Sequence, residues 1–445
     1  MSEKDAAAGL VEFVRACPSM FHTAAEICRR LDAAGFTRLR EADAWEMVPG
    51  GSYYVVRNNS SVVALKVGDE LGAPSRRASH HFQMAAAHGD SPTYKVKAVP
   101  VLEGPEGYLR LDVEAYGGML DHTWLDRPLG LAGRVLVRDG ARVESRLVDI
   151  ADDACLIPSL AIHLDRTSGL SPELNRAVDL CPLFSAGELP AGAFDEMVAE
   201  AAGCEPADVL ARDLFLVAHE EPRVWGRAGE FVSAGHLDDL QCAYVALEAF
   251  LAADNPGDVS VYACFDNEEV GSGTKQGALS TLLADTLSRT SAALGRTPEE
   301  HLRALASSML VSCDNAHAVH PAHPEKYDAA NRCRLNGGLV IKEAANQRYC
   351  TDAFSRAALI AVLDRAGVPY QTFANRSDVP GGSTLGNLSN TQVSVHAVDV
   401  GLPQLAMHSV FETAGARDTA LGIAALEAFY EADLLIDGAD GVEIR

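Results

Sequence analysis

The pattern of apolar and polar residues predicts helices at the start of the chain, followed by short strands. Apolar side chains recur at helical spacing, as in Ala24, Ile27 and Leu31, so we expect helices within the first forty residues. Short apolar runs rich in β-branched or aromatic residues then predict strands at 53–56, 62–67 and 82–87.

The pattern changes to strict alternation in the middle of the chain. Strands are predicted at 108–116, 134–139 and 142–150, and Asp139-Gly140 is a hairpin signal between the last two. Residues 185–212 are only weakly patterned. We therefore interpret 94–235 as an inserted, mainly β domain.

Alternating helices and strands return after residue 235. Helices are predicted at 239–253 and 418–431, and strands at 258–265, 309–313, 338–341, 370–374 and 394–400. This order is typical of an α/β fold whose mostly parallel sheet is sandwiched by helices. Residues 1–93 and 236–445 are accordingly predicted to form one discontinuous catalytic domain.

Composition narrows the possible partners. The chain has 445 residues and a formal net charge of −25, from 37 Lys and Arg against 62 Asp and Glu. So acidic a surface repels phosphate backbones and anionic lipids, so we expect no nucleic-acid and no membrane partner. A few cationic groups in a pocket would still allow an anionic substrate to bind.

Cysteine spacing and the N-terminus indicate a cytoplasmic location. No two of the ten cysteines lie within four residues of each other, so CxxC motifs are absent. The N-terminus carries no basic segment ahead of an apolar run, and no stretch of 18 apolar residues occurs.

Five segments place a histidine or a carboxylate near the end of an apolar run or in a turn. Such positions converge on one site in open α/β sheets. The residues are His88 with Asp90, Asp238, Glu268 with Glu269, Asp314, and His408. Imidazole and carboxylate are zinc ligands, and a pair of metals needs about five such ligands if one carboxylate bridges them. The Glu268-Glu269 pair could supply both a ligand and a general base.

Each of these residues also has a structural interpretation when taken alone. A His-x-Asp pair often fixes a side chain, and Asp238 is well placed to cap a helix. Two adjacent glutamates such as Glu268-Glu269 usually lie in a solvated turn. A histidine in an apolar context, such as His408, is usually a hydrogen-bonded core residue. Asp314 ends an apolar run, where a carboxylate needs a partner or a metal. It is the joint pattern that favours a metal site.

Long stretches of the chain resemble the aspartyl aminopeptidase family of co-catalytic zinc exopeptidases, from near residue 50 to near residue 430. The matching segments are AAAHGDSPTYKVK (85–97), YGGMLDHTWLDRPLGLAGRV (116–135), IPSLAIHLDR (157–166), HLDDL (236–240), DNEEVGSGTKQGA (266–278), CDNAHAVHPAHPEKY (313–327), GGLVIKEAANQRY (337–349), RSDVPGGSTLG (376–386) and DVGLPQLAMHS (399–409).

The resemblance implies a role for each candidate residue. His88 and Asp314 would hold one divalent metal, Glu269 and His408 the other, and Asp238 would bridge them. Glu268 would be the general base, and Asp90 would orient a ligand. The two metals would be zinc, although manganese or cobalt also suits these ligands.

The resemblance further implies removal of N-terminal Asp or Glu from small peptides. His320, Lys342 and Tyr349 match positions near the family's bound substrate. His163 matches a histidine that reaches into a neighbouring subunit's active site. The resemblance also implies that the inserted domain, 94–235, serves in oligomerisation or as a lid. The chain is therefore expected to form a homo-oligomer built from dimers, possibly a dodecamer.

Some positions depart from the family pattern. An acidic Asp239 replaces the usual amide beside the bridging aspartate. The other departures are Asn267 for His, Gly381 for Cys, Asn387 for Pro, and Ala322-His323-Pro324 for an Asn-Tyr pair. These changes alter the first substrate pocket, so one alternative is a same-fold aminopeptidase or deacylase of neutral or broad specificity. A second alternative is a binding protein that has lost catalysis, although the intact Glu268 and the five intact ligands speak against it.

Overall fold

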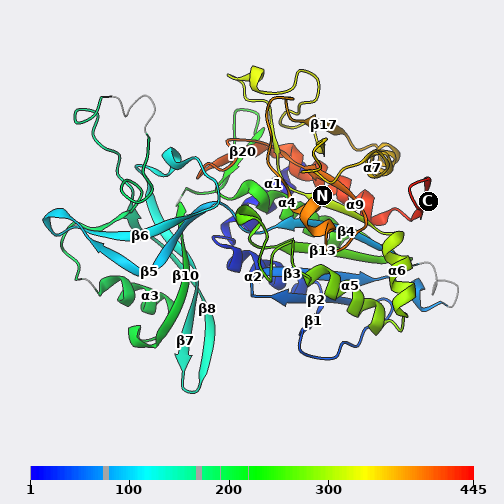
Figure 1. The fold of residues 1–445 in the computed structure, drawn as a ribbon, viewed down its shortest axis with the longest axis horizontal. Helices are drawn as coiled ribbons and strands as arrows, with labels where there is room; N and C mark the ends of the chain where they lie inside the picture. The colour runs from blue at the N-terminus through cyan, green and yellow to red at the C-terminus, as the bar shows by residue number, and fades with distance from the viewer. Residues whose placement is uncertain (1, 74–79, 167–172, 191, 219) are drawn as a thin grey trace.

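The computed structural model describes residues 2–73, 80–166, 173–190, 192–218 and 220–445. Parts of the predicted insertion (167–172, 191 and 219) therefore lie outside the described residues. Figure 1 shows a barrel standing beside a larger half built from a sheet and its helices.

The larger half contains a nine-stranded mixed sheet. Its strands, in spatial order, are β1 (Thr37–Leu39), β2 (Ser52–Arg57), β3 (Ser61–Val67), β13 (Val259–Phe265), β4 (Phe82–His88), β14 (Met309–Cys313), β18 (His396–Gly401), β16 (Leu339–Glu343) and β17 (Tyr370–Ala374). Five of the eight neighbouring pairs are parallel, including all three pairs in the central run β13-β4-β14-β18. The predicted parallel character is thus confirmed at the centre, whereas β3 runs against both neighbours and β16 against β18.

Helices cover both faces of this sheet, as predicted. One face packs against α1 (Glu3–Arg15), α2 (Met20–Ala33), α4 (Leu237–Ala252), α7 (Ala353–Ala366) and α9 (Ala416–Glu431). The other face packs against α5 (Leu282–Ala293), α6 (Pro298–Ala306) and α8 (Leu385–Asn390). Strand β4 shows why both faces are apolar: Met84 and Ala86 join one core, and Ala85 and Ala87 join the other.

The middle of the chain forms a closed barrel with its own apolar core. Its strands are β5 (Thr93–Glu103), β6 (Leu109–Tyr116), β7 (Pro128–Asp139), β8 (Arg142–Leu156), β9 (Leu183–Ser185) and β10 (Val209–Ala218). The hairpin expected at Asp139-Gly140 is confirmed, because Asp139 pairs with Arg142 across the turn. The weakly patterned stretch contains α3 (Ala193–Ala202) and the start of β10.

A third sheet of five strands is built from segments that all follow the last barrel strand in the chain. Its order is β11 (Arg223–Trp225), β12 (Phe231–Ala234), β20 (Glu412–Gly415), β19 (Pro403–Leu405) and β15 (Ala316–His317). Ala234 pairs with Glu412, so the last strands of the predicted insertion are bonded to the C-terminal part of the chain. The division at 94 and 235 therefore stays a prediction. The hairpin of β21 (Leu434–Asp437) and β22 (Gly441–Ile444) follows α9.

Two further features concern the chain as a whole. All ten cysteines are free. In the part of the chain that the structure describes, every helix is too short or too polar to serve as a membrane span.

The end of β18 lies in close contact with the segment that carries Asp314. A Cβ added at Gly401 would lie 1.9 Å from the main-chain oxygen of Asp314. We expect Gly401→Ala to lower the free energy of unfolding by about 1–3 kcal/mol, because this backbone contact cannot relax without moving Asp314. Gly441→Ala, at a strand glycine with nothing within 4 Å, is the matched control. Denaturant unfolding measures both, and an equal effect of the two changes would contradict this interpretation.

Candidate metal centre and active site

The C-terminal ends of three adjacent parallel strands bring four of the candidate residues to one edge of the main sheet. His88 is the last residue of β4, and Asp314 directly follows β14. Glu268 and Glu269 lie in the short turn after β13. Because β13, β4 and β14 are neighbours and parallel, these ends meet.

The third sheet positions two further candidates, Asp238 and His408. Asp238 follows β12 and lies in the first turn of α4, with φ −85° and ψ 106°, outside the helical region. Its peptide bond to Asp239 is cis. His408 lies in the turn between β19 and β20 with φ 63°. Asp238 is therefore positioned by irregular backbone, and the interpretation as a simple helix cap is wrong.

Asp238 lies between two imidazole rings. Its Oδ1 is 3.6 Å from His88 Nε2, and its Oδ2 is 3.5 Å from His408 Nε2. His408 Nε2 is also 3.4 Å from Glu269 Oε2. The two oxygens of one carboxylate thus face two separate histidines.

These side chains form compact sets of possible metal ligands. Two sets share Asp238: one adds His88 and Asp314, the other adds Glu269 and His408, and a further set joins His88 with Glu268 and Glu269. Asp238 Oδ1 and Glu269 Oε1 are buried and have no hydrogen-bond partner. Buried carboxylate oxygens of this kind need a partner, and with the imidazoles they form a donor set that suits a divalent metal such as zinc.

Crowding of buried carboxylates shifts their proton affinities. Burial, together with repulsion from Asp314 and Asp90, raises the pKa of Glu268 to about 8. Burial and the Asp238 carboxylate raise the pKa of Glu269 well above its ordinary value. Burial also raises the pKa of Asp314. A bound cation would relieve the same repulsion.

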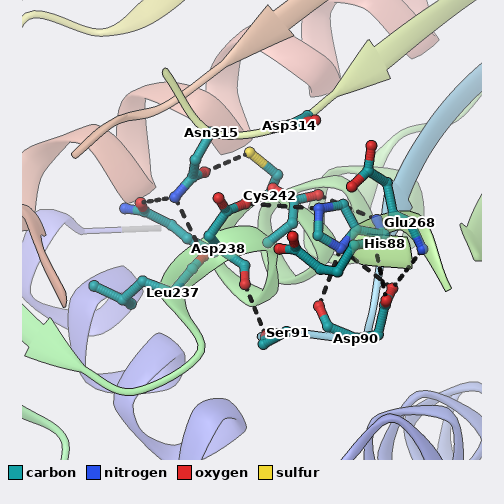
Figure 2. A network of polar contacts seen from close by, with 12 residues as sticks. His88, Asp90, Ser91, Leu237, Asp238, Cys242, Glu268, Asp314 and Asn315 are labelled. Carbon is teal, nitrogen blue, oxygen red and sulfur yellow. Dashed lines mark hydrogen bonds and ion pairs between the residues drawn. The ribbon is translucent and has the colours of Figure 1, made fainter. Parts of the chain in front are cut away.

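Asp90 contacts the main chain of Glu268 and Glu269 and the ring of His88 (Figure 2). Its Oδ1 accepts the N–H of Glu268 at 3.1 Å, and its Oδ2 accepts the N–H of Glu269 at 3.2 Å. His88 Nδ1 lies 3.0 Å from the Asp90 main-chain oxygen. Since that nitrogen faces a carbonyl, it carries the proton, and Nε2 is free to bind a metal. Tyr116, on barrel strand β6, donates to Asp90 Oδ2 at 2.7 Å.

Comparison with known proteins agrees with this donor set. The sequence model of the family described as "Aminopeptidase I zinc metalloprotease (M18)" matches residues 13–430. The chain is 39% identical to "Probable M18 family aminopeptidase 2" of Clostridium novyi, over 95% of this chain and 97% of that protein. The protein of the same name from Pseudomonas entomophila is 40% identical over 95% and 97%.

The chain belongs to the M18 family.

Solved structures of M18 proteins share its fold. The structure titled "Crystal structure of Aminipeptidase (M18 family) from Thermotoga Maritima" has a TM-score of 0.84 at 26% identity, covering 95% of each chain. The structure titled "Cryo-EM structure of the Ape4 and Nbr1 complex" has a TM-score of 0.92 at 33% identity, over 96% of this chain and 86% of that one. The chain is thus a zinc metallo-aminopeptidase, and the resemblance noted in the sequence is confirmed.

Lys342 and Tyr349 lie beside the candidate metal ligands of this M18 enzyme. Lys342 Nζ donates to the Asp314 main-chain oxygen at 2.7 Å and lies 3.6 Å from its Oδ1. The ammonium also lies 5.1 Å from the centre of the Tyr349 ring. Although burial opposes the charge, the Asp314 carboxylate raises the pKa of Lys342. A fixed positive charge is therefore buried against one edge of the cluster.

The other two predicted substrate residues lie on the surface of this single chain. His320 is exposed in the loop after β15, where its ring stacks on His323 with centroids 5.2 Å apart. His163 is exposed in a turn of the barrel half. Their predicted roles stay predictions.

Two functional candidates were missed. His317 lies three residues after Asp314 and lines a cavity of about 460 Å³ with Phe373. Burial, followed by the charge of Lys342, lowers the pKa of His317. The motif at 313–327 contains three histidines, His317, His320 and His323, and no sequence signal distinguished His317 from the other two. Glu412 accepts the main-chain N–H groups of both Asp238 and His408, and no sequence signal marked it.

We expect zinc binding to release protons at neutral pH. The raised pKa values of Glu268, Glu269 and Asp314 mean that the metal-free cluster holds protons, which the metal displaces. Zinc affinity should consequently increase as the pH rises. Calorimetric titration at pH 7 in buffers of different ionisation enthalpy measures the number of protons released. A binding enthalpy that does not depend on the buffer would contradict this expectation.

Proposed function

We propose that the enzyme is a two-metal aminopeptidase with a zinc-exopeptidase-like fold. His88 and Asp314 hold one metal, Glu269 and His408 hold the other, and Asp238 is shared. The supporting observation is the position of Asp238, whose two carboxylate oxygens each face a different histidine. Both three-residue ligand sets contain this aspartate.

Glu268 is the general base in this proposal. Zinc bound to the ligands supplies Lewis acidity toward the scissile carbonyl and the attacking water. Glu268 accepts the proton of that water and delivers it to the leaving amine. Asp90 holds the Glu268 main chain, so the base keeps its position.

The substrates in this proposal are small peptides with an N-terminal Asp or Glu. Lys342 supports this selectivity because it is the cation beside Asp314, at the edge where the ligands meet. Tyr349 lies against the Lys342 ammonium, whose charge also acts on His317. A neutral or broad specificity on the same metal centre remains the alternative, since Lys342 already pairs with Asp314.

The active form in this proposal is a homo-oligomer in the cytoplasm, built from dimers. A similar structure is titled "Structure of S. cerevesiae mApe1 dodecamer", with a TM-score of 0.84 and 28% identity over 96% of this chain and 97% of that one. Large apolar side chains are exposed around His163, namely Leu160, Ile162 and Leu164. An exposed apolar cluster of this kind favours a subunit contact, through which His163 would reach a second site.

Substituting the two adjacent glutamates separately tests the proposed mechanism. Glu268→Gln should keep both metals and lower kcat by about 10²–10⁴-fold, because only the general base is lost. Glu269→Gln is the matched control and should lose zinc, because its Oε2 lies at the His408 ligand group. Metal analysis and steady-state kinetics measure both. Near-normal kcat in Glu268→Gln would show that another group is the base.

A panel of Asp-, Glu-, Leu- and Lys-p-nitroanilides, with and without a chelator, tests the substrate class. We expect chelator-sensitive cleavage of the Asp and Glu substrates alone. Lys342→Met should lower kcat/KM for these substrates by about 10–100-fold, which corresponds to one lost charged hydrogen bond. Lys326→Met, at an exposed lysine that lines the neighbouring cavity, is the control and should change little. Efficient cleavage of the Leu substrate would favour the alternative of broad specificity.

A further inference from the structure

We propose that Glu412 is a positioning residue that fixes the separation between two proposed metal ligands, Asp238 and His408. The inference rests on the proposed two-metal function, because it assigns Asp238 and His408 to the same metal. Glu412 belongs to none of the ligand sets and acts through the main chain of two ligand residues.

The contacts of Glu412 are directed at both ligand residues at once. Its Oε2 accepts the main-chain N–H of Asp238 at 2.9 Å, and its Oε1 accepts the main-chain N–H of His408 at 2.6 Å. The side chain is buried, with only 2% of its surface exposed. Since both oxygens belong to one planar carboxylate, the two N–H groups are held at a fixed separation.

Neither N–H group has a partner within a regular element. Asp238 lies in the first turn of α4, where main-chain N–H groups lack carbonyl partners, and its own φ and ψ are not helical. His408 lies in a turn with a left-handed backbone. A buried N–H without a partner is costly, so Glu412 stabilises two irregular segments that regular hydrogen bonding cannot hold.

The third sheet determines where this carboxylate lies. Glu412 is the first residue of β20 and pairs with Ala234, the last residue of β12. Asp238 lies four residues after Ala234 in the chain, and His408 lies four residues before Glu412. The sheet register therefore places one side chain between the two turns that carry the ligands.

Asp418 offers a matched control for the same kind of interaction. It is also buried, its Oδ1 accepts the N–H of Gly338 at 2.9 Å, and its Oδ2 accepts the N–H of Asn336 at 2.6 Å. It lies outside the ligand sets. Glu412→Gln and Asp418→Asn each replace one acceptor oxygen by an amide NH2 group, which cannot accept a hydrogen bond, so each breaks one of two equivalent contacts.

The experiment measures zinc affinity of the full-length protein by competition with a chelating dye, together with the Tm of the zinc-free protein. Wild type should bind two zinc ions. In Glu412→Gln, one of the two should bind about 10–100-fold more weakly, and kcat should fall with KM nearly unchanged. Asp418→Asn should keep both zinc affinities within about twofold of wild type, even if its Tm falls as far as the Tm of Glu412→Gln.

Two results would overturn the inference: unchanged affinity for both ions in Glu412→Gln, or equal weakening in Asp418→Asn. If Glu412→Gln does not fold, Glu412→Asp, which keeps both oxygens but is one methylene shorter, should show the same loss for one ion, and unchanged binding would overturn the inference equally. A wild-type protein that binds a single zinc would instead refute the two-metal proposal.

Discussion

The burial of several carboxylates at one point is the constraint on which the rest of the structure depends. Asp238 and Asp314 are 3% and 8% exposed, and Glu269 contributes a further buried carboxylate oxygen. Lys342 is the cation paired with Asp314, and it does not neutralise the others. Carboxylates removed from water without counter-charges are strongly unfavourable, so the cluster must either take up protons or bind cations. The zinc chemistry of the M18 family meets that need.

The fold solves this problem with two sheets rather than one. The main sheet brings His88, Asp314 and the glutamate pair to a common edge. The third sheet brings in Asp238 and His408 from segments far apart in the chain. Asp90 accepts hydrogen bonds from the main chain of the glutamate pair, and Glu412 accepts them from the main chain of Asp238 and His408. Each group of candidate ligands is therefore held by a separate carboxylate. Through Tyr116, the barrel also contacts the first of these supports.

The sequence allowed prediction of those parts that depend on local pattern. The apolar runs before His88 and Asp314 identified β4 and β14, and the Asp139-Gly140 turn identified a barrel hairpin. The third sheet was not predicted, because its strands are two to four residues long and pair only across long separations. Glu412 was missed for the same reason, since its role comes from a long-range register. His317 was passed over for His320, because spacing alone does not show which histidine faces inward.

The central claim is that Asp238 is shared by two metal ions. A crystal structure of the zinc-loaded enzyme, with anomalous data collected on both sides of the zinc absorption edge, tests it most directly. The account predicts two anomalous peaks, one beside each oxygen of Asp238, with His88 and Asp314 at the first and Glu269 and His408 at the second. A single peak at saturating zinc, or two peaks that do not share Asp238, would contradict it.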